Sequence, residues 1–274
     1  DSACRASAEG RLCLGGSRSA EALRARFQAA RLPLGYFRPL LPPGTELVGE
    51  ISGGGHLSRT GQDPFTGEFN LETSRGHLAH RENGEALGEI AFGPSQFQAR
   101  ATPETLRGEG HLDLAGSDGL HTRWTVQRQE TLAAAPLSGH LRGRLTNLGF
   151  IPALFPEVSA LEGALELDVT AAGTVGAPAW DGGIRFTAKR IGLATPGITL
   201  RDARLTLAPA QEETLSLTGS ARSEDGRLEL AGRAGPGRER AWVEATLQGE
   251  DFLAYNTRDA RIHLSPDLSL ALRG

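Results

Sequence analysis

Two cysteines are the residues of this chain best suited to covalent chemistry. Cys4 and Cys13 lie nine positions apart with Gly10 between them, a spacing that suits a hairpin. They have neither the C-x-x-C spacing of a redox pair nor the additional ligands that a zinc site needs. The sequence therefore favours a structural disulfide between them, with two free thiols as the alternative. A disulfide would indicate an oxidising compartment such as a bacterial periplasm.

Histidines and carboxylates offer no recognisable catalytic arrangement. His77 and His80 could share a metal ion only on a helix, and no Asp or Glu ligand is placed for such a site. The chain has no P-loop, no G-x-S-x-G elbow and no H-E-x-x-H sequence. Its carboxylates are scattered over outward-facing positions. We therefore expect a protein that is not an enzyme and that holds no metal or cofactor.

Composition narrows the functional classes further. Of the 274 residues, 39% are apolar, only 5% are aromatic and 36 are glycine. The formal net charge is −4 with acids and bases interspersed, which does not fit a nucleic-acid binder. No run of 18 apolar residues predicts a membrane span. Because the chain has no Met and no signal peptide, we expect residues 1–274 to be a single elongated segment of a larger protein.

Short alternating strands occupy most of the chain after residue 44. Residues 110–116, 163–169 and 226–232 each alternate Leu or Val with polar residues and stop at a glycine or a polar turn. This alternation predicts a sheet with one apolar and one polar face, and the short turns predict antiparallel pairing. Residues 19–32 fit either a helix or a strand, and their context favours a strand.

An internal repeat strengthens this interpretation. Residues 34–51 and 148–165 align without a gap, each with a Pro-rich apolar turn before a strand. Repeats indicate an array of similar units that stabilise one another. Each apolar turn is interpreted as one helical turn that packs its large side chains on the apolar face of the sheet: Tyr36, Phe37 and Leu40 in the first copy, and Phe150, Ile151 and Leu154 in the second.

The apolar positions of the predicted strands form the candidate site. They share one side of each strand, opposite Glu, Asp, Arg, Thr and Ser. The predicted lining consists of Leu47, Ile51, Phe69, Leu71, Ile90, Phe92, Leu112, Leu114, Leu165, Leu167, Val169, Ile184, Phe186, Leu205, Leu207, Leu215, Leu217, Leu228, Leu230, Val243, Leu247, Leu268, Leu270 and Leu272.

Two architectures are compatible with these positions. In a β-sandwich or closed barrel, the two halves of the sheet would fill the space between them. In an open sheet folded lengthwise, the same residues would line an apolar channel, and glycines among them, such as Gly108 and Gly219, would leave room. The low aromatic content favours the channel. A lipid acyl chain fits a long groove without fixed polar contacts, because each buried methylene contributes about 0.8 kcal/mol.

Several segments of the sequence resemble the TamB family. Residues 167–186 are similar to its G-T-x-x-x-P-x-x-x-G strand–turn–strand signature, residues 196–205 to its G-I-x-L-x-D-x-x-L segment, and residues 265–268 to its S-P-D-L strand start. The cysteine pair and the Leu- and Pro-rich stretch of residues 32–43 also fit. The resemblance covers most of the chain and is strongest from about residue 138 to residue 273.

This resemblance implies a fold and a function. The fold would be an elongated antiparallel β-sheet folded lengthwise into a U-shaped apolar groove, a β-taco of the AsmA-like group, with one or two short helical turns. The implied function is a periplasmic conduit that carries phospholipid between the inner and outer membranes. The full-length protein would be anchored in the inner membrane of a Gram-negative bacterium.

The resemblance also implies partners and an alternative function. Phospholipid acyl chains would occupy the groove, and an outer-membrane partner, TamA, would bind through regions absent from this chain. The alternative is a chaperone that binds strands of outer-membrane β-barrel proteins during their assembly, using exposed strand edges. A spacer whose faces close on each other is a third possibility.

Overall fold

The structure is a computed structural model that describes residues 2–7, 10–19, 21–41, 44–82, 85–114, 119–146, 148, 151–155, 157–210, 214–235 and 242–273. Its described residues are mostly antiparallel strands with three short helical segments, which confirms the predicted all-β antiparallel class. The chain divides into two compact units. The expectation of one elongated segment of a larger protein stays a prediction.

Unit 1 comprises Asp1–Gly143 and Thr170–Ala179. Its strands are joined mainly by short turns, as the sequence predicts. They are β1 Ser2–Ser7, β2 Gly10–Arg18, β3 Ala22–Pro33, β4 Thr45–Val48, β5 Glu50–Thr60, β6 Thr66–Thr73, β7 Gly76–Glu82, β8 Glu85–Phe92, β9 Ser95–Ala101, β10 Thr105–Leu112, β11 Gly119–Gln127 and most of β12 Leu137–Leu145.

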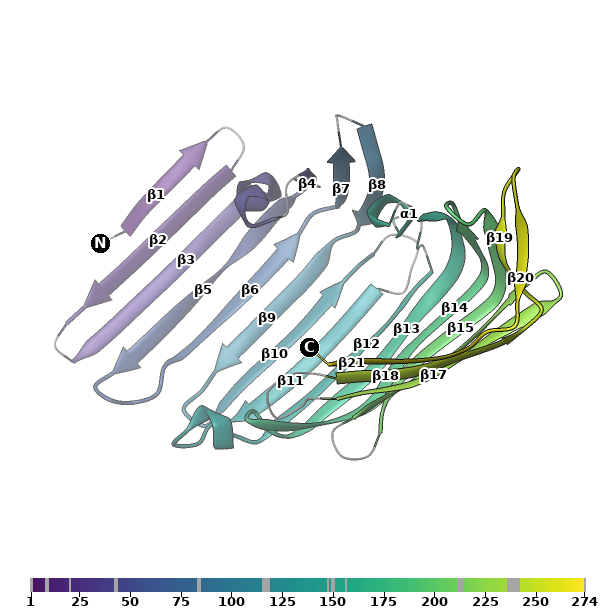
Figure 1. Ribbon diagram of the computed structural model, residues 1–274. Coiled ribbons are helices and arrows are strands. Elements are labelled where there is room, and N and C mark those ends of the chain that lie inside the picture. The colour runs from purple at the N-terminus through teal and green to yellow at the C-terminus, as the bar shows by residue number, and fades with distance from the viewer. Residues whose placement is uncertain are drawn as a thin grey trace. The chain divides into compact units, whose positions relative to one another are not determined.

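The strands of unit 1 form one main sheet and one small sheet. The main sheet has the order β1-β2-β3-β5-β6-β9-β10-β11-β12, and the small sheet has the order β4-β7-β8 (Figure 1). β1 pairs with a described strand on one side only, so the sheet is open at this edge. The segment that could be helix or strand in the sequence is the strand β3.

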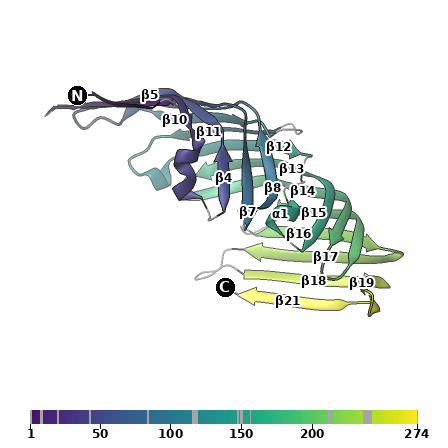
Figure 2. The ribbon, with the colours of Figure 1, turned by 90° about the horizontal axis from the view of Figure 1, so that it is seen from above.

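The small sheet begins where three chain segments leave the main sheet. β4 passes into β5 through Gly49, β6 into β7 through Ser74 and Arg75, and β8 into β9 through Gly93 and Pro94. Gly49 has a φ of 141°, a left-handed backbone that glycine tolerates best. Figure 2 shows β4, β7 and β8 directed to one side of the strands they continue.

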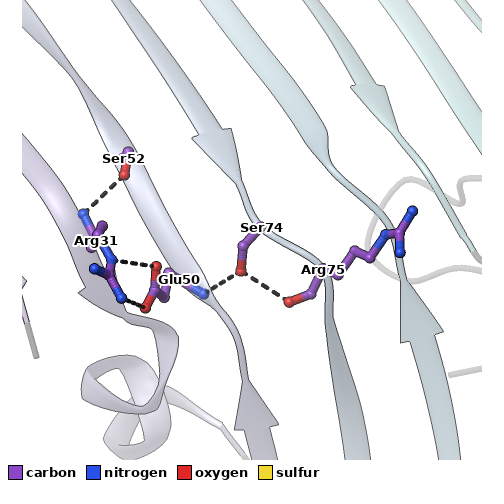
Figure 3. A network of polar contacts seen from close by, with 5 residues as sticks. All are labelled: Arg31, Glu50, Ser52, Ser74 and Arg75. Atoms are coloured by element: carbon purple, nitrogen blue, oxygen red, sulfur yellow. Dashed lines mark hydrogen bonds and ion pairs between the residues drawn. The ribbon is translucent and has the colours of Figure 1, made fainter.

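Polar side chains bond the backbone groups that the interrupted ladder leaves unpaired. The Glu50 backbone N–H donates to Ser74 Oγ at 2.9 Å, and the Arg31 backbone N–H donates to Ser52 Oγ at 2.9 Å (Figure 3). Ser95 is fully buried, and its Oγ accepts from the Asp113 backbone N–H at 3.0 Å. These bonds allow the chain to change direction without leaving buried donors unpaired.

Unit 2 comprises Arg144–Val169 and Trp180–Gly274. Its strands include most of two long ones, whose turn ends belong to unit 1. They are β13 Val158–Thr174, β14 Ala177–Leu193, β15 Ile198–Pro209, β16 Leu215–Ser223, β17 Gly226–Gly235, β18 Trp242–Glu250, β19 Phe252–Asn256, β20 Arg261–Leu264 and β21 Asp267–Arg273.

The main sheet strands of unit 2 follow the order β13-β14-β15-β16-β17-β18-β21, and β21 has a described partner on one side only. A bulge between β15 and β16 shifts the register between Arg201 and Arg204, and Asp202 there has a φ of 50°. Bulges of this kind bend a strand and increase its twist.

A small hydrophobic core lies at one end of unit 2. The β19–β20 hairpin interrupts the path from β18 to β21, and β19 contacts the ends of β15, β16 and β17. Phe252 and Leu253 are buried there against Ile198. The Asn256 backbone N–H donates to the Pro196 carbonyl at 2.7 Å, which fixes the hairpin to the turn before β15.

The helical segments only partly match the expected apolar turns. They are the 3₁₀ helices η1 Leu34–Leu40 and η2 Leu132–Ala134, and the single-turn helix α1 Ile151–Leu154. Leu34 is buried, but Tyr36 and Phe37 are exposed, so the expectation that these two rings pack on the sheet is wrong. Among the expected contacts of the second copy, Phe150 lies outside the described residues.

Candidate functional site

Strand register gathers apolar side chains into rows across unit 1. Residues directly opposite in antiparallel strands point to the same face. Three such rows lie on one face, here called the unit 1 apolar face. Row A contains Leu14, Phe27, Gly55, Phe69, Ala99, Gly108 and Trp124; row B contains Leu12, Ala29, Gly53, Leu71, Phe97, Gly110 and Thr122; row C contains Gly16, Ala25, Leu57, Gly67, Ala101, Leu106 and Val126.

Aromatic rings on this face lie over glycines of neighbouring strands. A Cβ added at Gly108 would lie 2.6 Å from Trp124 Nε1, and one added at Gly110 would lie 2.6 Å from Phe97 Cδ1. Gly55 is similarly covered, because a Cβ there would meet Phe69 Cβ at 2.5 Å. The glycines thus provide space for rings to lie against the sheet, an arrangement known to stabilise strand glycines.

The unit 1 apolar face is accessible to solvent. Leu14, at the β2 end of row A, is 55% exposed. Leu57 and Phe69 lie inside their rows and are still 42% and 41% exposed. A groove of about 530 Å³ runs between rows A and C. No described segment of unit 1 therefore packs over this part of the face, and the face offers an apolar surface that another molecule can cover.

The opposite face of unit 1 is polar and holds a larger hollow of about 1380 Å³. Its side chains come from two rows: Arg26, His56, Glu68, Arg100 and Arg107, and Gln28, Asn70, Gln98, Glu109 and Arg123. They interact with one another, since Gln98 Nε2 donates to Glu109 Oε1 at 2.5 Å and Arg123 Nη2 lies 3.4 Å from Glu109 Oε2. This hollow is therefore bordered by polar side chains that interact with one another.

Unit 2 repeats the arrangement of apolar rows on one face, the unit 2 apolar face. One row contains Ile184, Leu207, Leu217, Gly232, Ala245 and Leu270. The next contains Phe186, Leu205, Gly219, Leu230, Leu247 and Leu268, and a third contains Pro209, Leu215, Ala234, Val243 and Leu272. Leu228 lies on the same face, opposite Ala221 and Gly249.

These rows are also incompletely covered. Leu268, Leu270 and Leu272 are each more than half exposed on β21. On β13, Leu165, Leu167 and Val169 are half-buried. Glu166 lies between the first two and pairs with Arg185 of β14 at 3.4 Å, as expected for a charged residue on the polar face. Unit 2 therefore has the same two-faced character as unit 1.

The predicted lining residues occupy two kinds of place. Ile51, Phe69, Leu71 and Leu112 lie on the unit 1 apolar face, and the predicted residues from β14 to β21 lie on the unit 2 apolar face. Leu47, Ile90, Phe92 and Leu114 do not: the first three belong to the small sheet, where Leu47 and Ile90 flank Leu78, and Leu114 forms an isolated bridge with Phe92. None of the predicted lining residues is fully buried.

Sequence reasoning missed several members of rows A and C, among them Leu14, Phe27 and Trp124. The alternation of Ala25, Phe27 and Ala29 was a usable signal for β3. Trp124 gave a weaker signal, because its glycine neighbour Gly108 is sixteen positions away in the sequence and only the β10–β11 register brings them together.

The structure places the cysteine and histidine candidates for covalent chemistry and metal binding. Cys4 and Cys13 are directly opposite in the β1–β2 hairpin, and their sulfurs are bonded. His77 and His80 lie on the strand β7 and not on the helix that a shared metal ion would need. No group of three or more potential metal ligands occurs within the described residues.

One pKa shift marks the edge of unit 1 near the small sheet. The hydrogen bond from Arg31 to Glu50 and then the charge of Glu50 raise the pKa of the Arg31 guanidinium above its ordinary value. The stability that a raised pKa contributes is present below the unfolded pKa of arginine and decreases as the pH rises through the folded pKa, far above neutrality. We therefore expect this pair to add no pH dependence near neutrality.

Comparisons with known proteins identify a family for this arrangement. The family model described as TamB, N-terminal domain, matches residues 1–186. Neither the curated proteins nor the solved structures contain a match. Within the described part of the chain, no helix has the length and apolar character needed to cross a membrane.

Proposed function

Since this chain belongs to the TamB family, a family of bacterial envelope proteins linked to lipid or protein transport and not a known enzyme family, we propose that it is a section of a phospholipid conduit. The acyl chains would lie along the apolar faces of units 1 and 2, and the headgroups would stay in contact with water. The conduit would work in the periplasm between the inner and outer membranes.

One observation carries this proposal: apolar rows continue from strand to strand in each unit, yet their side chains remain accessible. In unit 2, Leu205, Leu215 and Val243 stay more than a third exposed although they lie within the sheet. Leaving so much apolar surface in water is unfavourable, at about 25 cal/mol per Å². A molecule with a long apolar chain and no need for fixed polar partners removes this penalty most fully.

The rows also run across successive strands, which is the direction in which the proposed conduit would carry an acyl chain. Each row crosses successive strands, which lie about 4.8 Å apart. A 16-carbon acyl chain that follows a row would therefore contact four or five strands and gain up to about 10 kcal/mol from burial. Because the contacts repeat from strand to strand, an acyl chain that moves along the row exchanges one set of apolar contacts for an equivalent set.

Charged substitutions within the rows test the proposal. In the full-length protein, Phe186→Glu and Leu217→Glu should reduce phospholipid delivery to the outer membrane at least about tenfold, because a carboxylate on the apolar face is costly to cover with hydrocarbon. Thr187→Glu and Thr218→Glu, on the polar face of the same strands, are the matched controls.

Direct contact can be measured in the same protein. A photo-crosslinking amino acid at Leu230 on the apolar face should capture phospholipid, whereas one at Glu229 on the polar face should not. The proposal is wrong if the charged variants fold and deliver lipid at the normal rate, or if crosslinking is equal on both faces.

A further inference from the structure

An arginine pair borders the unit 1 apolar face at one end. Arg59 follows Leu57 of row C by two residues on β5, and therefore lies on the same face. Arg128 follows Val126 of row C by two residues, just after β11 ends, and its backbone N–H donates to the Glu104 carbonyl at 2.7 Å. Both positions thus lie immediately beyond the groove between rows A and C.

Phe65 brings the two arginines together. The Arg59 guanidinium carbon lies 5.2 Å from the centre of the Phe65 ring. Arg128 Nη2 donates to the Phe65 carbonyl at 2.6 Å. Since β9 and β10 lie between β6 and β11 in the sheet, the Arg128 side chain reaches across the β9–β10 turn to make this bond.

Within the described residues, neither guanidinium forms an ion pair with an acidic side chain. The Nε atoms of Arg59 and Arg128 are buried without a hydrogen-bond partner. Glu104, the acid nearest to Arg128 along the β10–β11 pairing, instead accepts from Thr102 Oγ1 at 3.2 Å.

Two partly desolvated positive charges without a counter-ion are unfavourable unless an anion binds them. Arginine binds phosphate especially well, because its planar guanidinium donates two parallel hydrogen bonds to phosphate oxygens. Arg59 and Arg128 stand next to an uncovered apolar groove of about 530 Å³. The ligand that satisfies both features has a phosphate at one end and hydrocarbon at the other.

We propose that Arg59 and Arg128 form a binding site for the phosphate of a phospholipid headgroup, with the acyl chains of that lipid in the groove between rows A and C. This inference rests on the proposed function, because it assumes that lipid occupies the apolar face. It adds a chemical preference: unit 1 distinguishes phosphate-bearing lipids from neutral lipids with the same chains. Arg59 and Arg128 also position the lipid at one end of the rows.

A competition between two lipids tests this site. The whole chain is incubated with equal amounts of dioleoyl phosphatidylglycerol and dioleoylglycerol, and bound lipid is counted by native mass spectrometry. We expect the chain to prefer the phospholipid at least about tenfold, as one charge-assisted hydrogen bond would provide. In the double variant Arg59→Gln/Arg128→Gln, the preference should fall close to one while dioleoylglycerol still binds.

Matched variants separate this effect from general charge and folding. Arg26→Gln/Arg100→Gln removes the same charge from the polar face and should keep the preference. Arg59→Lys/Arg128→Lys keeps the positive charge but loses the paired hydrogen-bond donors. This variant should keep only part of the preference for phospholipid. Thermal melting of each variant checks that the fold is intact.

The outcomes distinguish the two proposals. If both lipids bind equally to the unchanged chain, or if the glutamine variant keeps its preference, the phosphate site is wrong while the conduit stands. If neither lipid binds, both proposals fail. Displacement of the phospholipid by millimolar inorganic phosphate would show a site for free phosphate, which overturns the assignment to a lipid headgroup.

Discussion

At the scale of single residues, glycine has an unusual part in building the apolar faces. In a sheet, glycine normally weakens a strand because it has no side chain to pack. Here Gly55, Gly108 and Gly110 each accommodate a ring or its Cβ from the next strand. Aromatic rings and glycine backbone therefore form the floor of the groove. The groove stays open because the rings lie flat against the sheet and do not project into the space above it.

We predict that Gly108→Ala disturbs this floor. The added methyl would lie 2.6 Å from Trp124 Nε1, so the indole must move or the strands must separate. Overpacking of this kind costs about 1–3 kcal/mol. Urea denaturation followed by tryptophan emission should show a lower midpoint and a shifted native spectrum.

The control for this substitution is Gly139→Ala on β12, where the nearest atom to an added methyl would be 3.6 Å away, at Trp124 Cβ. This contact is ordinary, and the stability of the variant should match that of the unchanged chain. Equal stability of both variants would show that the indole does not lie over Gly108 in solution.

At the scale of elements, the β1–β2 hairpin carries a disulfide at the open edge of the main sheet. Among the described strands, β1 pairs with β2 alone, through six residue pairs that include Cys4 opposite Cys13. An edge strand with one neighbour is readily frayed and offers its free edge to other strands. The bond between the two cysteines counteracts this, because it restricts the unfolded hairpin.

Removal of the disulfide should release β1. Closing a loop of about ten residues contributes about 2–3 kcal/mol by the chain-entropy account. In Cys4→Ser/Cys13→Ser, amide hydrogens of residues 2–7 should therefore exchange much faster, while those of β5 and β6 keep their protection. Unchanged exchange of residues 2–7 in the variant would show that pairing alone holds the strand.

The sequence predicted the strands and their apolar sides because both depend on local alternation. Leu217 and Leu230, for example, are assigned correctly to one face from their own strands alone. Register is not local, so the alternation cannot reveal that Leu47 and Ile90 each pair with Leu78 in a separate small sheet. The same limit hides the arginine pair, because Arg59 and Arg128 meet only through the fold around Phe65.

At the scale of the whole molecule, the solvent-accessible surface area agrees with apolar faces that are left uncovered. The chain exposes 18220 Å². A compact monomer with its mass of 29.0 kDa would expose roughly 11,000 Å². The difference is far larger than a few loops can account for, and the exposed apolar rows of both units contribute to it. Much of the apolar surface that a globular protein would bury thus remains available to a ligand.

This surface leads to a calorimetric prediction for the intact chain. The heat capacity change of unfolding follows the surface newly exposed, and for a compact protein of this length it would be about 3–4 kcal/mol/K. Because the folded chain already exposes more surface, unfolding exposes about a quarter less, and the heat capacity change summed over all transitions should be lower by a similar fraction.

Phospholipid should reverse this deficit, since lipid that covers the apolar rows in the folded state is released on unfolding and the rows then become newly hydrated. Differential scanning calorimetry with and without dioleoyl phosphatidylglycerol measures both quantities. A lipid-free value equal to that of a compact protein would mean that the Leu and Phe rows are already shielded from water in solution. In that case hydrocarbon would have no surface to occupy, and the conduit would have to be abandoned.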